Sequence, residues 1–194
     1  MLRRLPMADY HALQAVGDVY LDSIGWNGGT TTFNALAHNL PVVTLLRYFN
    51  VYGSRQSLCN PYSGLVAHFY ARLCTKQPLL LYEKGTPGRD FVHVRDVVYA
   101  NLLALTTPLP PALCLNIGSG QCHSLYELAA TLIAVTGLNS PLQPTDYYRV
   151  GDIHTCYADL RCAQQWLGYH PQVDLCAGLQ EFATWAKQQN GTLV

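Results

Sequence analysis

The feature that most constrains the fold is a largely apolar run from Leu40 to Phe49, rich in Val and Thr. A short run without polar alternation is typical of a parallel strand that is covered on both faces. Residues 8–16 have the spacing of a helix, 18–22 form a short strand pattern, and 27–30 make a turn that opens a helix to about residue 38. This alternation of helix and strand predicts an α/β fold.

The rest of the chain continues the same rhythm. We predict helices over 65–75, from 95 or 96 to about 105, over 124–136 and over 175–189, with a short helix around Arg161. We predict strands over 79–82, 91–94 and 113–117, a loop over 55–64 and a tight turn over 84–88. Ser124 and Glu127 have the spacing of a capping box, which marks the start of a helix.

The charge content limits the classes of partner. Charged residues make up 12% of the 194 residues, about half the usual share of ~25%, and hydrophobic residues make up 49%. Such a composition indicates a large core or an exposed apolar face that meets a partner, so we consider a homo- or hetero-oligomer. The net charge is zero and the basic residues are scattered, which argues against nucleic acid as a partner.

Cysteine usage and hydropathy point to the cytoplasm. No apolar run reaches the ~18 residues of a membrane span, and the first residues lack the hydrophobic region of a signal peptide. We therefore expect no membrane association. The seven cysteines include no Cys-x-x-Cys pair, so we expect reduced thiols and no metal site.

Three polar clusters suggest an anionic ligand. Asn50 follows the long apolar strand, where open α/β sheets bind ligands. Arg89 and Arg149 each stand beside a glycine and an acidic residue, and Asp152 follows Arg149. A diphosphate favours the planar donors of Arg, and a ribose diol favours a carboxylate. Taken alone, an Arg–Asp neighbour of this kind is more often a surface ion pair. For His93, which lies in a predicted strand, we expect a structural role.

Five ordered motifs carry a family resemblance between about residues 41 and 187. They are LRYFNVYG, RDFVHVRDV, LNIGSG with SLYELA, RVGDIHTCYADL and WLGYHP. Together they resemble the carboxyl-terminal part of the extended short-chain dehydrogenase/reductases, in the branch of NAD-dependent nucleotide-sugar epimerases and dehydratases. UDP-glucose 4-epimerase-like and dTDP-sugar epimerase-like members are the most similar. The resemblance implies a partial Rossmann-like parallel sheet plus a small mixed α/β substrate-binding region.

The same resemblance assigns roles to individual residues. It implies that two residues lie near the nicotinamide of NAD and that five bind a UDP- or dTDP-linked sugar. The NAD pair is Tyr48 and Phe49, and the substrate set is Asn50, Arg89, Phe91, Arg149 and Asp152. Gly118-Ser119-Gly120 looks like a dinucleotide fingerprint, but His123 stands at the third glycine, and in the family this is a structural turn.

The catalytic elements of that family are missing from this sequence. The family uses a Tyr-x-x-x-Lys pair and a glycine-rich NAD motif, G-x-x-G-x-x-G. Tyr-x-x-x-Lys does not occur, because the residues four positions before Lys76, Lys84 and Lys187 are Arg72, Leu80 and Ala183. The sequence also contains no G-x-x-G-x-x-G. We therefore predict no catalytic residue in this chain and no NAD binding by the chain alone.

The segment 1–45 resembles a different family, the O-GlcNAc-transferase-like glycosyltransferases. There a glycine-threonine turn at a helix N-terminus holds the UDP diphosphate, which implies an alternative site at Gly29, Thr30 and Thr31. An ordinary strand–turn–helix is the competing interpretation. The predicted division is a glycosyltransferase-like fragment over 1–45 and an epimerase/dehydratase part over 46–194, joined within the strand that both families share.

The leading functional hypothesis is a nucleotide-sugar-binding portion of an epimerase or dehydratase that is inactive alone. Three alternatives stay open. The chain is active with catalytic groups supplied by another chain, or it is a glycosyltransferase remnant, or it is a non-enzymatic partner of an intact homologue.

Overall fold

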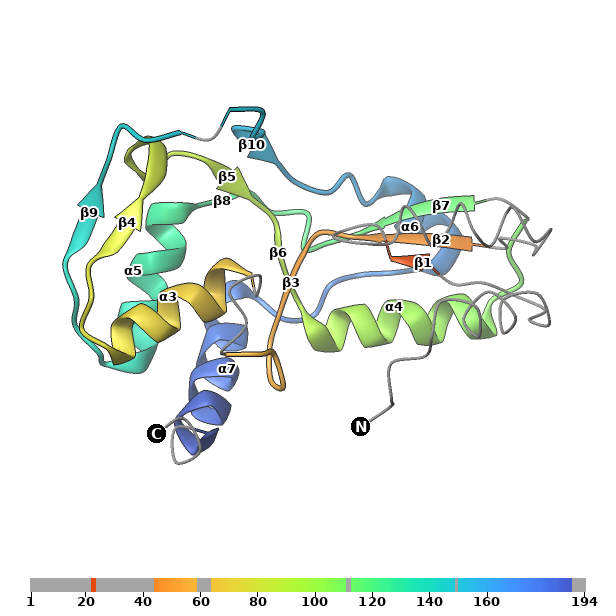
Figure 1. Ribbon diagram of the computed structural model, residues 1–194. Coiled ribbons are helices and arrows are strands. Elements are labelled where there is room, and N and C mark those ends of the chain that lie inside the picture. Colours follow the sequence, from red (N-terminus) through yellow and green to blue (C-terminus); the bar gives the residue numbers. More distant parts are fainter. Residues whose placement is uncertain (1–21, 24–43, 59–63, 111–112, 149, 190–194) are drawn as a thin grey trace, which may run out of the picture.

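The computed structural model describes residues 22–23, 44–58, 64–110, 113–148 and 150–189 (Figure 1). The predicted helices over 8–16 and from about 31 to 38, and the turn over 27–30, lie outside these residues. The described part has an α/β fold, as the sequence predicts.

The first half of the fold is a three-stranded parallel sheet of order β1-β2-β7. Its strands are β1 (Asp22–Ser23), β2 (Thr44–Tyr48) and β7 (Leu113–Ile117). Helix α4 (Val94–Thr106) runs along the sheet beside β2, and α6 (Arg161–Leu167) contacts β7 (Figure 1). The core between them is mostly aliphatic, with buried Leu46, Val92, Leu115 and Ile117, and it also contains the fully buried Tyr169.

The second half is mainly helical. It contains α3 (Leu65–Cys74), α5 (Leu125–Thr136) and α7 (Leu175–Gln189), with a parallel pair of short strands, β4 (Leu79–Leu81) and β9 (Leu142–Pro144). Helix α5 packs against both α3 and α7. Their shared core is built from large side chains, including Phe69, Tyr70, Leu128, Leu132 and Phe182.

A pair of strands and a small sheet connect the sheet-containing half to the helical half. Strand β3 (Asn50–Tyr52) pairs in parallel with β6 (Phe91–His93). Strand β5 (Gly88–Arg89) pairs in parallel with β10 (Thr155–Cys156) and antiparallel with β8 (His123–Ser124). The two pairings of β5 bring segments from three parts of the chain to one place.

The local signals of the sequence are confirmed for most elements. The helices α3, α4, α5, α6 and α7 and the strand β7 form where the sequence predicts them. The capping box is present, because Glu127 N donates to Ser124 Oγ at 3.1 Å and Ser124 N donates to Glu127 Oε2 at 2.8 Å.

Two local predictions differ from the structure. The sequence predicts that the apolar strand ends at Phe49, but a further strand, β3, follows it. This strand forms because Asn50 N donates to Asp90 O at 3.0 Å and because β3 pairs with β6. The turn expected over 84–88 begins earlier, over Tyr82–Gly85, where Glu83 and Lys84 have positive φ, and Gly88 already belongs to β5.

The predicted division at residue 45 falls inside a strand. Strand β2 spans this boundary, and β1 from the first segment pairs with it. The assignment of 1–45 to a separate fragment stays a prediction.

Candidate functional site

The guanidinium of Arg89 is held in one orientation by two backbone carbonyls. Its Nη1 donates to Gly88 O and to His154 O, each at 2.9 Å. Its Nη2 donates to Asp152 Oδ1 at 3.0 Å. The Arg89 side chain is 15% exposed and that of Asp152 is 49% exposed. The site therefore presents one edge of a fixed cation beside a carboxylate that solvent reaches.

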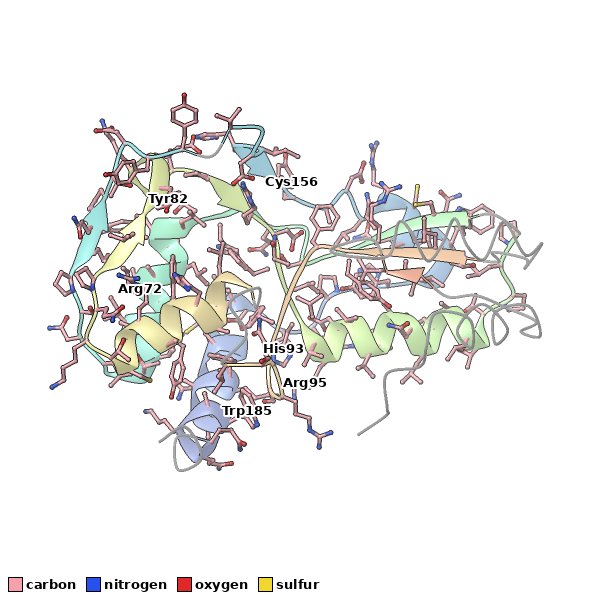
Figure 2. The ribbon with its side chains drawn as sticks, viewed as in Figure 1. Arg72, Tyr82, His93, Arg95, Cys156 and Trp185 are labelled. Atoms are coloured by element: carbon pink, nitrogen blue, oxygen red, sulfur yellow. The ribbon has the colours of Figure 1, made fainter. Side chains whose placement is uncertain are left out.

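The pairing of β5 with β10 is what brings these two residues together. The register sets Gly88 opposite Thr155 and Arg89 opposite Cys156. Gly88 N donates to His154 O at 2.9 Å, and Asp90 N donates to Cys156 O at 3.1 Å. Figure 2 shows Cys156 on this strand at the rim between the two halves. Arg89 and Asp152, 63 positions apart, thus meet through backbone hydrogen bonds.

Asp90 organises the backbone around the site. Its carboxylate is completely buried and accepts four hydrogen bonds. Ser119 N and Ser119 Oγ donate to Oδ1 at 2.7 Å each, while Gly120 N at 2.9 Å and Ala158 N at 3.0 Å donate to Oδ2. A buried carboxylate is stable when its lone pairs are satisfied in this way. Asp90 therefore ties the loop after β7 and the segment after β10 to β5.

This arrangement decides the role of the Gly118-Ser119-Gly120 turn. The amide hydrogens of Ser119 and Gly120, which a dinucleotide fingerprint would offer to a pyrophosphate, are taken by Asp90. A Cβ at Gly118 would collide with the Asp90 carboxylate and with Ala158. The turn is structural, as the sequence predicts, and it does not fit NAD.

Asn50 lies at the same junction. Its side-chain Nδ2 donates to Asp90 O at 2.9 Å, beside the bond from its own backbone amide to that oxygen. Asn50 is exposed and sits opposite Phe91 in the β3–β6 pair. Phe91 is only 3% exposed and belongs to the core of the helical half. The structure thus places Asn50 at the surface, bonded to the backbone of Asp90, with Phe91 buried in the core.

The two residues that the resemblance assigns to NAD lie at the end of β2. The Tyr48 hydroxyl donates to Asn101 Oδ1 at 2.9 Å. Tyr48 and Phe49 are partly buried and pack against the core of the sheet. The remaining predicted site residues, Gly29, Thr30, Thr31 and Arg149, lie outside the described residues.

His93 is buried and structural, as the sequence predicts. Its Nδ1 accepts a hydrogen bond from Arg95 N at 3.4 Å, which caps α4, and its Nε2 lies 3.8 Å from Glu181 Oε1 (Figure 2). Burial lowers the pKa of His93 below its usual 6.5; the Glu181 carboxylate opposes this shift and the Arg95 guanidinium adds to it. A neutral imidazole suits this cap because the acceptor nitrogen must stay unprotonated.

A groove of about 520 Å³ borders the loop that follows β7. Ser119, Gln121 and Tyr157 line it, together with Asp159 and Arg161. Arg161 holds the Asp159 carboxylate through side-chain hydrogen bonds, which lowers the pKa of that carboxyl to about 2. The groove has both polar and apolar lining residues, and its Asp159–Arg161 pair is satisfied internally.

Sequence reasoning missed the role of Asp90 and of the His154 carbonyl. The Arg89-Asp90 dipeptide was the available signal. The sequence predicts a ligand contact for Arg89 alone, whereas alternation along an extended chain sends neighbouring side chains to opposite faces. Arg89 consequently faces Asp152, while Asp90 faces the buried loops.

Within the described residues, no group of His, Cys, Asp and Glu side chains is arranged to hold a metal ion. None of the helices in that part of the chain has the length and apolar character needed to cross a membrane.

The fold indicates the class of protein that this chain is similar to. The three-stranded parallel sheet, with the connecting pair β3 and β6, has the Rossmann-like α/β fold of solved sugar-nucleotide epimerases. UDP-glucose 4-epimerase from Thermotoga maritima, solved with UDP-glucose, superposes with a TM-score of 0.72 at 32% identity, over 83% of this chain and 50% of that one. MoeE5, solved with UDP-glucuronic acid and NAD, has a TM-score of 0.70 at 30% identity, over 81% of this chain and 53% of that one.

The sequence comparisons agree with the structural ones. Residues 32–118 match the model of the NAD dependent epimerase/dehydratase family. The dTDP-L-rhamnose 4-epimerase of Burkholderia thailandensis is 39% identical over 156 residues, which are 80% of this chain and 42% of that enzyme. The chain thus matches part of a sugar epimerase/dehydratase domain and spans about half the length of the relatives it matches.

Proposed function

We propose that this chain is the nucleotide-sugar-binding portion of an NAD-dependent sugar epimerase or dehydratase, and that it binds the diphosphate of a UDP- or dTDP-linked sugar. The observation that carries the proposal is the Arg89 guanidinium, fixed by Gly88 O and His154 O beside the half-exposed Asp152.

The chemistry of this pair matches such a ligand. Arg is always charged and its planar donors suit phosphate oxygens, and a carboxylate accepts hydrogen bonds from a sugar diol. We assign the diphosphate to Arg89 and Arg149, the ribose to Asp152, and a phosphate contact to Asn50. Phe91 supports this wall from the core.

Loss of one Arg–phosphate contact tests the proposal. UDP-glucose is titrated into the full 194-residue chain by calorimetry. We expect Arg89→Ala to weaken binding by roughly 10- to 100-fold, because a hydrogen bond to a charged group contributes about 1.5–3 kcal/mol. The matched control is Arg95→Ala, which removes an arginine that is 64% exposed and pairs with Glu181. Unchanged binding by Arg89→Ala, or no binding by the unaltered chain, contradicts the proposal.

We further propose that the chain is inactive alone, because the sequence has neither Tyr-x-x-x-Lys nor the glycine-rich motif. No catalytic step is assigned to the described residues. The purified chain with NAD and UDP-glucose should show no epimerisation above background. Turnover by the pure chain would refute this.

The alternative functions make separate predictions. If the segment 1–45 holds UDP as in glycosyltransferases, Thr30→Ala weakens UDP binding while Arg89→Ala does not. If the chain acts as a non-enzymatic partner, it forms a stable complex with an intact epimerase, and mixing the two on a sizing column tests this.

A further inference from the structure

We propose that the start of α4 is a pH-sensitive switch, which holds the helical half of the fold to the sheet-containing half while His93 is neutral and loosens this connection when His93 takes up a proton. The contacts come from three residues, His93, Arg95 and Asp96, which we call the α4 junction. The inference is independent of the proposed function, because none of these residues belongs to the proposed diphosphate site.

Asp96 connects α4 to the segment that leads into α7. The residue is 2% exposed, and its carboxylate accepts hydrogen bonds from Gln172 N at 2.9 Å and from Val173 N at 3.2 Å. These donors stand shortly before α7, which begins at Leu175. Because a buried carboxylate is costly without such partners, this contact fixes the entry of α7 relative to α4.

The other two residues of the α4 junction contact α7 itself. Arg95 Nη1 lies 3.5 Å from Glu181 Oε2, and His93 Nε2 lies 3.8 Å from Glu181 Oε1. Figure 2 shows His93 and Arg95 together where β6 meets α4. Helix α7 lies so close that a Cβ at Gly178 would be 3.1 Å from His93 Cδ2. The imidazole is therefore enclosed between the two halves of the fold.

The neutral imidazole fits this enclosure and the charged one does not. His93 Nδ1 accepts from Arg95 N at 3.4 Å, so the neutral ring carries its hydrogen on Nε2. The ring is completely buried, and Nε2 has no hydrogen-bond partner within the described part of the chain. A proton on Nδ1 would set a donor against Arg95 N and would place a charge in a buried position. Both effects favour an arrangement in which the ring leaves its place and α7 moves away from it.

The surrounding groups set the direction of the switch. Besides Asp174 and Cys176, which act on the Tyr52 hydroxyl, the charged or titratable groups near the ring are Tyr52 of β3, Arg95 and Asp96 of α4, and Glu181 of α7. Burial lowers the pKa of His93 below 6.5 and Arg95 adds to this shift, while the two carboxylates oppose it. Burial raises the pKa of Tyr52, which therefore stays neutral. The open form of the junction thus binds the proton more tightly, so the closed form is fully stable above pH 6.5 and loses stability below it.

Hydrogen exchange of single amides, followed by NMR in the full 194-residue chain, tests the inference. The amides of Arg95, Gln172 and Val173 donate to the α4 junction. Gly137 N, which donates to Ile133 O at 3.0 Å at the end of α5, is the reference because a helix end opens without exposing His93. Each rate is divided by the intrinsic rate at the same pH. We expect the opening constants of the three junction amides to rise together by about tenfold per pH unit below 6.5, since opening takes up one proton. That of Gly137 N should change by less than about twofold per unit.

A substitution identifies the group that titrates. His93→Gln keeps a polar side chain but removes the titrating group, so the pH dependence of the three junction amides should disappear. The matched control is His170→Gln, which makes the same change at an exposed histidine between α6 and α7. It should leave the tenfold dependence of about one proton in place.

The unaltered chain alone can overturn the inference, even if His93→Gln does not fold. Junction amides that depend on pH no more than Gly137 N would show that no proton is linked to opening. An equal dependence at Gly137 N would show that the whole fold, rather than the α4 junction, responds to the proton. A dependence that persists in a folded His93→Gln variant would assign the proton to another group.

Discussion

Replacing Asp90 by Asn tests how the site is held together. The substitution keeps the shape of the side chain but puts an NH₂ group in place of one carboxylate oxygen. Two backbone amides lose their acceptor if the NH₂ group replaces Oδ2, and one loses it if the NH₂ group replaces Oδ1, because the Ser119 hydroxyl can turn to accept.

The expected cost follows from the number of lost bonds. A hydrogen bond to a charged group contributes about 1.5–3 kcal/mol, so the loss of one or two such bonds destabilises the chain by roughly 1.5–6 kcal/mol. Because domains have a net stability of about 5–15 kcal/mol, this is a large share of the total. The loss should concentrate at the loop after β7, which the Asp90 carboxylate ties to the segment after β5.

Urea unfolding followed by circular dichroism measures this cost. We expect a lower midpoint with an unchanged slope, since the surface exposed on unfolding stays the same. Amide hydrogen exchange gives a second measurement, and Gly120 N should exchange faster in the variant. Asp146, whose side chain is 88% exposed, supplies the control, and Asp146→Asn should change the free energy of unfolding by less than about 0.5 kcal/mol. A loss below about 1 kcal/mol for Asp90→Asn would refute the reasoning.

Four further predictions concern other parts of the fold. The pKa of His93 is lowered by burial, so the unfolded state takes up the proton first. The contribution of neutral His93 to the free energy of unfolding should therefore be fully present above the unfolded pKa of 6.5 and should be lost as the pH drops below it. His93→Gln should flatten this pH dependence, measured by urea unfolding at several pH values. Ser124→Ala removes the cap of α5 and should cost about 1 kcal/mol, measured by thermal or urea unfolding. Gly178→Ala sets a methyl group against the Tyr52 hydroxyl, and the overpacking cost of about 1–3 kcal/mol should exceed the gain in helix propensity of up to ~1 kcal/mol, which urea unfolding would show. Leu102 is 55% exposed on α4, so if an apolar face of the chain mediates self-association, Leu102→Lys should lower the apparent mass in sedimentation at high concentration.

The exposed side of α4 is relevant to the predicted oligomer. Val98, Leu102 and Leu105 are 53%, 55% and 66% exposed, and their spacing of four and three residues places them on one helix face. This face is a specific candidate for the apolar contact surface that the low charge content suggests. Association itself stays a prediction.

The sequence by itself determined the elements whose signals are local. The capping box at Ser124 fixes the start of α5 within one turn, and the apolar strand over 113–117 appears where its pattern predicts it. The same holds for the identity of Arg89 and Asp152 as candidates, because their residue types and neighbouring glycines are visible without a fold. These properties depend on a few consecutive residues, which a single sequence reports well.

Only the tertiary structure decided how these pieces meet. The strands β5, β8 and β10 have two residues each, too few to show a periodic pattern. They exist because segments far apart in the chain supply each other's backbone hydrogen bonds, and that pairing brings Asp152 to Arg89. The role of Asp90 was hidden for the same reason, since its four donors come from residues 29 to 68 positions away. Contacts of this kind depend on the packing of the whole fold, and no local pattern of residues reports them.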